Sequence, residues 1–277
     1  MLAGVRHEDH STFGNENIPR YGLIINPLEN TALKLNHGKH FKAPTPNDLF
    51  WPYEDWGGGM GAEGNSDLKP ETGWHTDITV EQILIDNKLF ITLSYFNWDI
   101  DDKIRWAPDA FFFYRPENLD SYSAEGFEIG TVIGPFYNLT LSLNYSYTDA
   151  EENKATGFKR HALYTPNKYF KGNLTYWFDF GLTASATVRY MDERPGYYSS
   201  DTDTTPAHIL KSYWTADLKI EHRLFEHWIL SLEGNNLFDK EYDTYVENFT
   251  NQSTNVTTME GYPGAGRSAF FSVSYEY

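Results

Sequence analysis

Large aromatic side chains gather in two stretches of the sequence, near residues 50–56 and 106–114, where their flat rings could stack on a planar ligand. Aromatic rings offer a large contact area and lose little conformational entropy on binding. The residues that we expect to contact such a ligand are Phe50, Trp51, Tyr53, Trp56, Trp106 and Tyr114. Packing within loops or at a membrane interface is the other interpretation of each ring.

Oxygen and nitrogen donors lie in the same part of the chain. Ca²⁺ takes several oxygen ligands, and an acidic cluster is formed by Asp48, Glu54, Asp55, Glu63 and Asp67. Its spacing is irregular, so a solvated acidic loop is the favoured interpretation and no metal ligand is assigned. His37 and His40 precede this cluster, where a solvated polar role is again favoured.

Residue types used in catalysis are present without the arrangements that catalysis needs. The chain has no Cys, no Gly-x-Ser-x-Gly elbow and no His-Glu-x-x-His pair, and Gly57–Gly59 lacks the lysine of a phosphate-binding loop. We therefore expect neither enzyme activity nor a cofactor. A membrane-barrel protease or lipase is the rival among enzymes.

Composition narrows the structural class. Aromatic residues make up 17% of the 277 residues, yet the mean hydropathy is −0.56 and no apolar run approaches the roughly 20 residues of a membrane helix. A transmembrane β-barrel has this composition, because its strands face lipid on one side and the lumen on the other. With 22 basic against 39 acidic residues, the chain does not favour nucleic acid as a partner.

The elements that would position the aromatic stretches are strands with period-2 alternation. Between Leu139 and Tyr147, apolar or aromatic residues alternate strictly with Thr, Ser and Asn. We predict an all-β, antiparallel transmembrane barrel segment of about twelve strands. The strands are expected near residues 2–7, 21–25, 33–35, 78–80, 89–95, 122–129, 139–147, 174–178, 182–190, 214–220, 230–232 and 269–277.

Short and long connections alternate between these strands. Short turns are expected at 27–30, 85–87, 134–136, 179–180 and 225–227, and long polar loops at 9–17, 39–73, 99–118, 149–165, 192–208 and 235–266. This asymmetry is typical of bacterial outer-membrane barrels, whose long loops are extracellular. A soluble β-sandwich would explain one such strand, but not twelve with aromatic residues at their ends.

The last strand carries aromatic or apolar residues at every second position, at Ala269, Phe271, Val273, Tyr275 and Tyr277. This pattern resembles the C-terminal signature that the bacterial barrel-assembly machinery reads. We therefore expect Phe271, Val273, Tyr275 and Tyr277 to act as a membrane-assembly signal.

Several motifs, in order along nearly the whole chain, resemble those of TonB-dependent receptors. They are FKAPTPNDLFW at 41–51, GNSDLKPE at 64–71, YRPEN at 114–118, EGFE at 125–128, NNLFDKEY at 235–242 and YPGAGR at 262–267. A single Gly-Asn or Pro-Gly cluster would indicate only a loop.

The resemblance implies a barrel of about 22 strands, plugged by an N-terminal domain, that imports a scarce nutrient with energy delivered by the TonB complex. Residues 1–277 are expected to form the C-terminal portion of that barrel, with the plug domain and signal peptide absent. Outer-membrane lipid and a small nutrient, a ferric siderophore or cobalamin, are the expected partners. Haem is disfavoured because no His lies between Pro44 and Asn65. A passive porin is the alternative, although a porin has no reason to carry the paired motifs.

Overall fold

The computed structural model describes residues 1–109, 112–119, 121–153, 157–200, 202–225, 227–251 and 256–276. Twelve strands follow one another in chain order along one antiparallel sheet, and β12 (Lys159–His161) pairs beside β11. These strands are β1 (Leu2–His10), β2 (Gly14–Leu28), β3 (Thr31–Lys42), β6 (Glu71–Leu84), β7 (Leu89–Asp101), β10 (Ser121–Phe136), β11 (Leu139–Asn153), β13 (Lys168–Trp177), β14 (Leu182–Met191), β17 (Tyr213–Leu224), β18 (Trp228–Asn235) and β21 (Ser268–Tyr275). The predicted fold class and strand count are confirmed.

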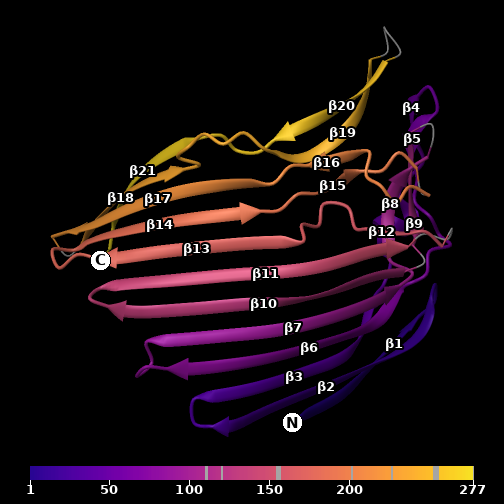
Figure 1. Cartoon of the computed structure of the whole chain (residues 1–277). Coiled ribbons are helices and arrows are strands. Elements are labelled where there is room, and N and C mark those ends of the chain that lie inside the picture. Colours follow the sequence, from indigo (N-terminus) through magenta and orange to yellow (C-terminus); the bar gives the residue numbers. More distant parts are fainter. Residues whose placement is uncertain are drawn as a thin grey trace.

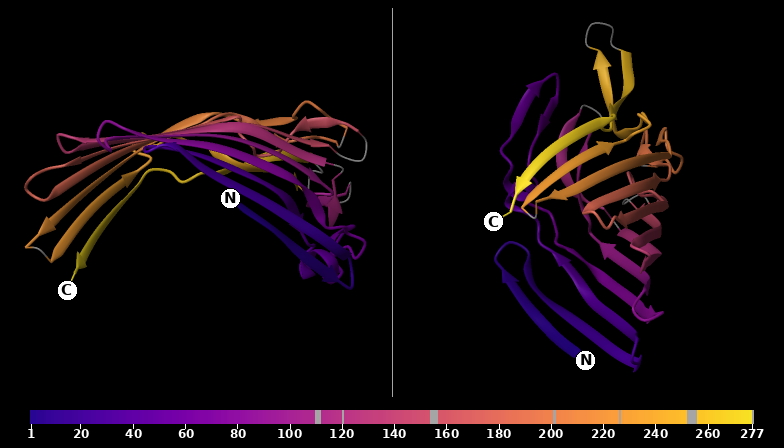
Figure 2. Two further views of the ribbon diagram at one scale, coloured as in Figure 1. Left: turned by 90° about the horizontal axis from the view of Figure 1, so that it is seen from below. Right: turned by 90° about the vertical axis from the view of Figure 1, so that its left-hand side faces the viewer.

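The sheet curls into an open trough, with β1 at one free edge and β21 at the other (Figures 1 and 2). Short turns join the strands at one end, and the longer connections lie at the opposite end (Figure 1). Strands β10 and β11 have 16 and 15 residues, whereas roughly 9–11 residues cross a bilayer. We infer that the strands extend beyond the membrane on the long-loop side.

The longer connections contain secondary structure of their own. They hold α1 (Pro46–Phe50) and three small sheets: β4 (Glu54–Gly57), β5 (Met60–Ala62), β9 (Phe113–Asn118) and β8 (Ile104–Pro108) form the first, β15 (Arg194–Tyr197) and β16 (His208–Leu210) the second, and β19 (Asp243–Asn251) and β20 (Val256–Pro263) the third. The long loop predicted at 9–17 is wrong, because β1 and β2 stay paired up to His10 and Gly14. Polar residues there alternate within paired strands rather than forming a loop.

The register places apolar residues side by side on one face. Across six strands from β11 to β21, the paired residues of one row are Leu139, Tyr176, Ala184, Ile220, Leu232 and Phe271. A second row on the same face joins Leu141, Leu174, Ala186 and Leu218. Because a shift of one residue would move each row to the other face, this register is what keeps the apolar belt continuous.

The other face is polar. Its rows include Ser142, Asn173, Thr187 and Asp217, and the Asn173 amide donates to the Thr187 hydroxyl at 2.9 Å. Two hollows on the sheet are lined largely by residues of this face, among them Thr92, Asn144 and Ser146 in one and Arg189, Thr215 and Asp217 in the other. The polar face is therefore the concave, lumen side of the trough.

A turn between β10 and β11 shows why the short end can be so compact. Phe136 pairs with Leu139, so only Tyr137 and Asn138 make the reversal, and both have positive φ, 49° and 64°. Two consecutive left-handed residues form the type I′ turn, whose twist matches that of the flanking strands. The reversal lies just beyond the predicted turn at 134–136.

Candidate functional site

The five long connections form one layer at the end of the trough opposite the short turns (Figure 1). We call their described residues, within 43–70, 102–120, 154–167, 192–212 and 236–267, the loop layer. Several of the most buried side chains of the described chain lie here, including Leu49, Leu119, Leu210 and Val246. The layer is therefore packed, and its exposed side chains are presented on a defined surface.

Helix α1 forms because its first residues satisfy their own backbone. The Thr45 hydroxyl accepts from the Asp48 amide at 3.2 Å, and the Asp48 carboxylate accepts from the Thr45 amide at 2.8 Å. This reciprocal capping box, with Pro46 at the first turn, sets the helix start. The helix ends at Phe50 and thereby presents Phe50 and Trp51 to the surface, 64% and 37% exposed.

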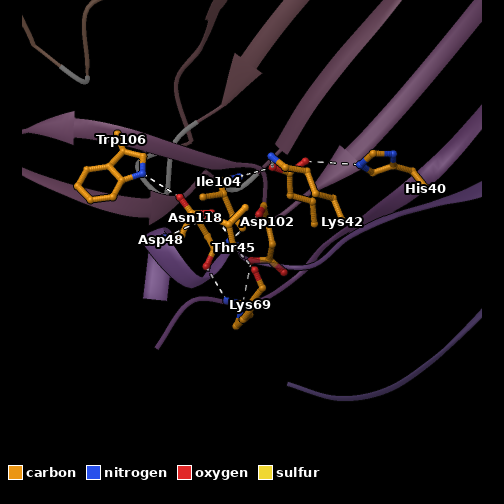
Figure 3. A network of polar contacts seen from close by, with 10 residues as sticks. His40, Lys42, Thr45, Asp48, Lys69, Asp102, Ile104, Trp106 and Asn118 are labelled. Carbon is orange, nitrogen blue, oxygen red and sulfur yellow. Dashed lines mark hydrogen bonds and ion pairs between the residues drawn. The ribbon is translucent and has the colours of Figure 1, made fainter. Parts of the chain in front are cut away.

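Asp48 also joins two loops that are distant in sequence. The indole nitrogen of Trp106 donates to Asp48 Oδ1 at 2.8 Å (Figure 3). The Trp106 ring lies edge-on to Trp51 with centroids 6.2 Å apart. Burial opposes ionisation of Asp48, but the hydrogen bonds from Thr45 and Trp106 outweigh it and lower the pKa of the carboxyl. Asp48 is thus a structural anion, not a free metal ligand.

The small sheet β4-β5-β9-β8 combines loops 43–70 and 102–120 into one unit. Strand β5 runs parallel to β9, and the Glu63 amide donates to the Tyr114 carbonyl at 3.1 Å. Asn118 bridges the same loops, accepting from the Lys69 amide at 2.9 Å and donating to its carbonyl at 3.0 Å (Figure 3). A Cβ at Gly61 would lie 2.1 Å from the Glu54 carbonyl oxygen, so only glycine allows this approach.

Glu71 anchors the small sheet to the barrel rim. Its carboxylate is buried and accepts from Lys42 Nζ at 2.7 Å and from the Ile104 amide at 3.0 Å, with His40 at 3.5 Å (Figure 3). Lys42 ends β3, Glu71 begins β6 and Ile104 begins β8. The Glu71 carboxylate therefore holds together the ends of β3, β6 and β8 at the point where loops 43–70 and 102–120 leave the barrel wall.

A buried ion network extends this packing to the next two loops. Glu152 accepts from Arg160 at 2.7 Å and faces Arg105 at 3.4 Å, and Arg105 in turn contacts Glu117 at 3.0 Å. Arg160 donates to the Ser200 carbonyl at 3.0 Å. Loops 102–120 and 154–167 are consequently held together by ion pairs to the buried Glu152, and Arg160 links loop 192–212 to them through the Ser200 carbonyl.

The six aromatic residues predicted to bind a ligand lie in loops 43–70 and 102–120, which the small sheet β4-β5-β9-β8 joins. The structure brings Trp51 next to Trp106 and Trp56 next to Tyr114, the latter pair with ring centroids 6.2 Å apart. Tyr53 stacks on Phe113 at 5.7 Å. Tyr53 and Trp56 are 64% and 54% exposed, whereas Trp106 and Tyr114 are half-buried. Each half-buried ring therefore contacts a more exposed one, Trp106 contacting Trp51 and Tyr114 contacting Trp56.

Sequence reasoning missed a second aromatic group. Tyr245 of β19 stacks on Tyr164 at 5.1 Å and lies 5.6 Å from Tyr262 of β20. Burial, and then the neighbouring Tyr245, raise the pKa of Tyr164 to about 12, so its hydroxyl stays protonated and donates to the Val246 carbonyl at 3.2 Å. Tyr262 belongs to the YPGAGR motif, and this motif was the only feature of the sequence that pointed to the second aromatic group.

Two motifs that carried the family resemblance contact each other. The Asn236 amide donates to the Ala265 carbonyl at 3.1 Å, and Asp239 Oδ1 accepts from the Arg267 amide at 2.9 Å. Asn236 is buried, and its backbone N–H donates to Asp217 on the lumen face of β17. These motif residues hold the two ends of the connection that carries the β19–β20 hairpin.

The residues of the predicted assembly signal lie on the edge strand β21. Phe271, Val273 and Tyr275 pair with Leu232, Leu230 and Trp228, on the apolar face. Tyr277 lies outside the described residues. The alternation of this strand is therefore confirmed, while its role in assembly stays a prediction.

Within the described residues, no group of three or more His, Cys, Asp or Glu is arranged to hold a metal ion. The acidic cluster between Asp48 and Asp67 is spread over α1, β4 and the turns, with Asp48 used as a cap. No helix among the residues that the structure places is long and apolar enough to cross a membrane.

Comparisons with known proteins agree with this architecture. The profile of the family described as "TonB dependent receptor-like, beta-barrel" matches residues 1–237. The chain is 27% identical over 277 residues to the vitamin B12 transporter BtuB of Vibrio vulnificus, covering 99% of this chain and 40% of that protein. It is 26% identical over 270 residues to the iron-regulated outer membrane virulence protein of Vibrio cholerae, covering 89% and 39%.

A crystal structure of a ferric enterobactin receptor (PfeA) variant from Pseudomonas aeruginosa, in complex with enterobactin, has the same fold. The TM-score is 0.78 at 24% identity, covering 99% of this chain and 42% of that one. The chain thus spans about two fifths of the length of the relatives it matches. On strand order, loop asymmetry and sequence, the chain belongs to the outer-membrane TonB-dependent receptor family, as part of its β-barrel domain.

Proposed function

We propose that the chain supplies wall and ligand-binding loops to an outer-membrane receptor for TonB-energised uptake of a scarce nutrient such as a ferric siderophore or cobalamin. The observation that carries this proposal is the exposed aromatic surface built from loops 43–70 and 102–120. Phe50 at the end of α1, Tyr53 before β4 and Trp56 in β4 are more than half exposed, although burial would stabilise such rings by roughly 1.5–3 kcal/mol each. Exposed rings on a packed support favour a binding role.

The extent of the chain supports a wider assembly. Its open trough has two unpaired edges, at β1 and β21, and relatives are more than twice as long. We propose that residues 1–277 are the C-terminal portion of a closed barrel, and that contact with the TonB complex is made by a plug-bearing portion. Catalysis is not part of this proposal, because the family comprises receptors and transporters and the presented surface is aromatic.

Assembly into the membrane would use the last strand. We propose that the barrel-assembly machinery reads Phe271, Val273, Tyr275 and Tyr277, and that lipid covers the apolar rows. Deleting Tyr277 should reduce the amount of protein in the outer membrane, measured by fractionation and immunoblotting. Normal amounts after deletion would remove Tyr277 from the signal.

The binding proposal is tested by replacing Trp51 and Trp56 together with Ala. In outer-membrane vesicles from cells that make the protein, binding of radiolabelled vitamin B12 and ferric enterobactin is measured at equal receptor content. Loss of two stacking rings should weaken binding of the ligand by more than about tenfold, that is about 1.4 kcal/mol. The matched control replaces Trp177 and Trp228, which are 42% and 45% exposed at the short-turn end. Equal binding by both double variants would overturn the aromatic site.

A further inference from the structure

We infer that the ligand of the loop layer is a flat, ring-bearing molecule without net negative charge, held between loop 43–70 and the β19–β20 hairpin. The inference rests on the proposed receptor function and specifies its substrate class. It draws on the second aromatic group, the position of that group beside the first, and the sign of the charges that surround both.

The hairpin group is a fixed surface. Tyr245 is 46% exposed and Tyr262 49%, and both rings meet beside Tyr164. Between them, Val246 is 2% exposed and packs against Gly196 of β15, where a Cβ would lie 2.8 Å from the valine side chain. The packing of Val246 against Gly196 therefore holds this part of the hairpin, with Tyr245, against β15.

The two aromatic groups share one electrostatic environment. Burial raises the pKa of Tyr114, and the negative charge of Glu247 and then Tyr245 raise it further. Tyr114 itself contacts Trp56. The two hairpins β4–β5 and β19–β20, which carry Trp56 and Tyr245, both project from the loop end of the trough (Figures 1 and 2). A ligand that contacts Trp56 is thus within the field of Glu247.

Neutral donors hold the carboxylates beside these rings. Glu54 accepts from the Trp56 indole at 3.1 Å, Asp55 from the Gly57 amide at 2.8 Å, and Glu247 from the Tyr262 hydroxyl at 2.6 Å. All three donors are neutral, so these hydrogen bonds hold the anions without cancelling their charge.

Two carboxylates also oppose each other on the hairpin. Glu247 of β19 pairs directly with Glu260 of β20, and both are exposed. Like charges directly opposite on paired strands destabilise the pairing. A bound cationic or neutral polar group beside Tyr245 and Tyr262 would relieve this repulsion, and a bound anion would add to it.

The cations of the loop layer are directed elsewhere. Lys69 pairs with Asp102, Arg105 pairs with Glu117 and Glu152, and Arg160 pairs with Glu152. Arg115 follows Tyr114 on β9, so by strand alternation it points to the other side of the small sheet. The aromatic surface is therefore negative, and its ring faces attract cations as well. A triply anionic iron catecholate complex is repelled on both counts.

The test compares two probes on the protein in outer-membrane vesicles: vitamin B12, which has no net charge, and ferric enterobactin, a triply anionic catecholate complex. We expect vitamin B12 to bind at least about tenfold more tightly at low ionic strength, with the preference shrinking at 0.5 M salt as the charges are screened. Glu247→Gln should strengthen binding of the anionic probe several-fold and leave vitamin B12 nearly unchanged. Glu29→Gln, at the turn after β2, is the matched control and should change neither.

Tighter binding of ferric enterobactin, unaffected by salt or by Glu247→Gln, would overturn the charge inference while leaving the receptor function standing. If neither probe binds to the wild type above the level of vesicles without the protein, the receptor proposal fails, and the charge inference fails with it. Glu247→Gln and Glu29→Gln could also reduce the preference for vitamin B12 equally. That result would assign the selectivity to the net charge of the protein and would exclude the hairpin from the binding site.

Discussion

The barrel wall and the loop layer solve the problem of stability in opposite ways. In the wall, large apolar residues such as Leu33, Leu93 and Val188 remain 37–49% exposed, because lipid takes the place of a protein core. In the loop layer, which faces water, Leu119 and Leu210 are at most 2% exposed, and the buried Arg160 pairs with Glu152 at the end of β11. The wall therefore needs only alternation of apolar and polar residues, whereas the loops need specific side-chain partners.

The largest effect is expected where the loop layer relies on a buried charge. Glu152→Ala leaves Arg160, with 3% of its side chain exposed, without its carboxylate, and should cost about 3–5 kcal/mol. Hydrogen exchange of β8, β9 and β12 should report the loss. Glu151→Ala is the matched control, since its contact with Lys159 is exposed and worth about 0–1 kcal/mol. Similar protection in both variants would show that the network does not hold the loops.

A charge in the wall should have the next largest effect, and only on one face. Leu143 lies on the apolar face of β11, so Leu143→Arg should cost about 2–4 kcal/mol of unfolding free energy near the bilayer midplane. Asn144→Arg places the same charge on the lumen face and should cost far less. Equilibrium unfolding in lipid vesicles measures both, and equal costs would contradict the assigned faces.

A smaller effect is expected at the capping box of the loop layer. Asp48→Ala removes the carboxylate half of the capping box and the acceptor of Trp106, and should cost about 0.5–2 kcal/mol of local stability. Asp55→Ala, on exposed β4, is the control. Proteolysis between residues 43 and 70 compares the two, and equal cleavage rates would show that Asp48 does not hold this loop.

The same carboxyl predicts a pH dependence. Because folding lowers the pKa of Asp48, its stabilising contribution is present above the unfolded value of about 3.9 and is lost as the pH falls below that value. Protection of α1 from hydrogen exchange should therefore decline below about pH 4 in the wild type. The decline should be weaker in Asp48→Ala, and an unchanged profile would contradict the assignment.

The least perturbing test uses spin labels at Leu141 and Ser142. Neighbouring positions of β11 face opposite solvents, so a label at 141 should be accessible to oxygen dissolved in lipid and a label at 142 to a water-soluble nickel reagent. Equal accessibility of both positions would contradict the two-faced wall.

The wall could be predicted because its physics is local. Alternation of apolar and polar residues, as in Leu139 to Tyr147, places each side chain on a face without knowledge of any partner strand. Twelve such runs, separated by alternating short and long connections, gave the sheet, its direction and its strand order. The long connection expected at 9–17 failed because polar residues such as Asp9 and Glu16 remain paired in β1 and β2.

The sequence alone determined the wall, the family resemblance and the aromatic character of residues 50–56 and 106–114. Only the tertiary structure decided that Trp51 meets Trp106, that Asp48 and Glu71 hold the loops together, and that Tyr164, Tyr245 and Tyr262 form a second aromatic group beside Glu247. The physical reason is range: strand alternation repeats every two residues, but these contacts join positions 15 to 81 residues apart, where no local pattern in the chain encodes the partner.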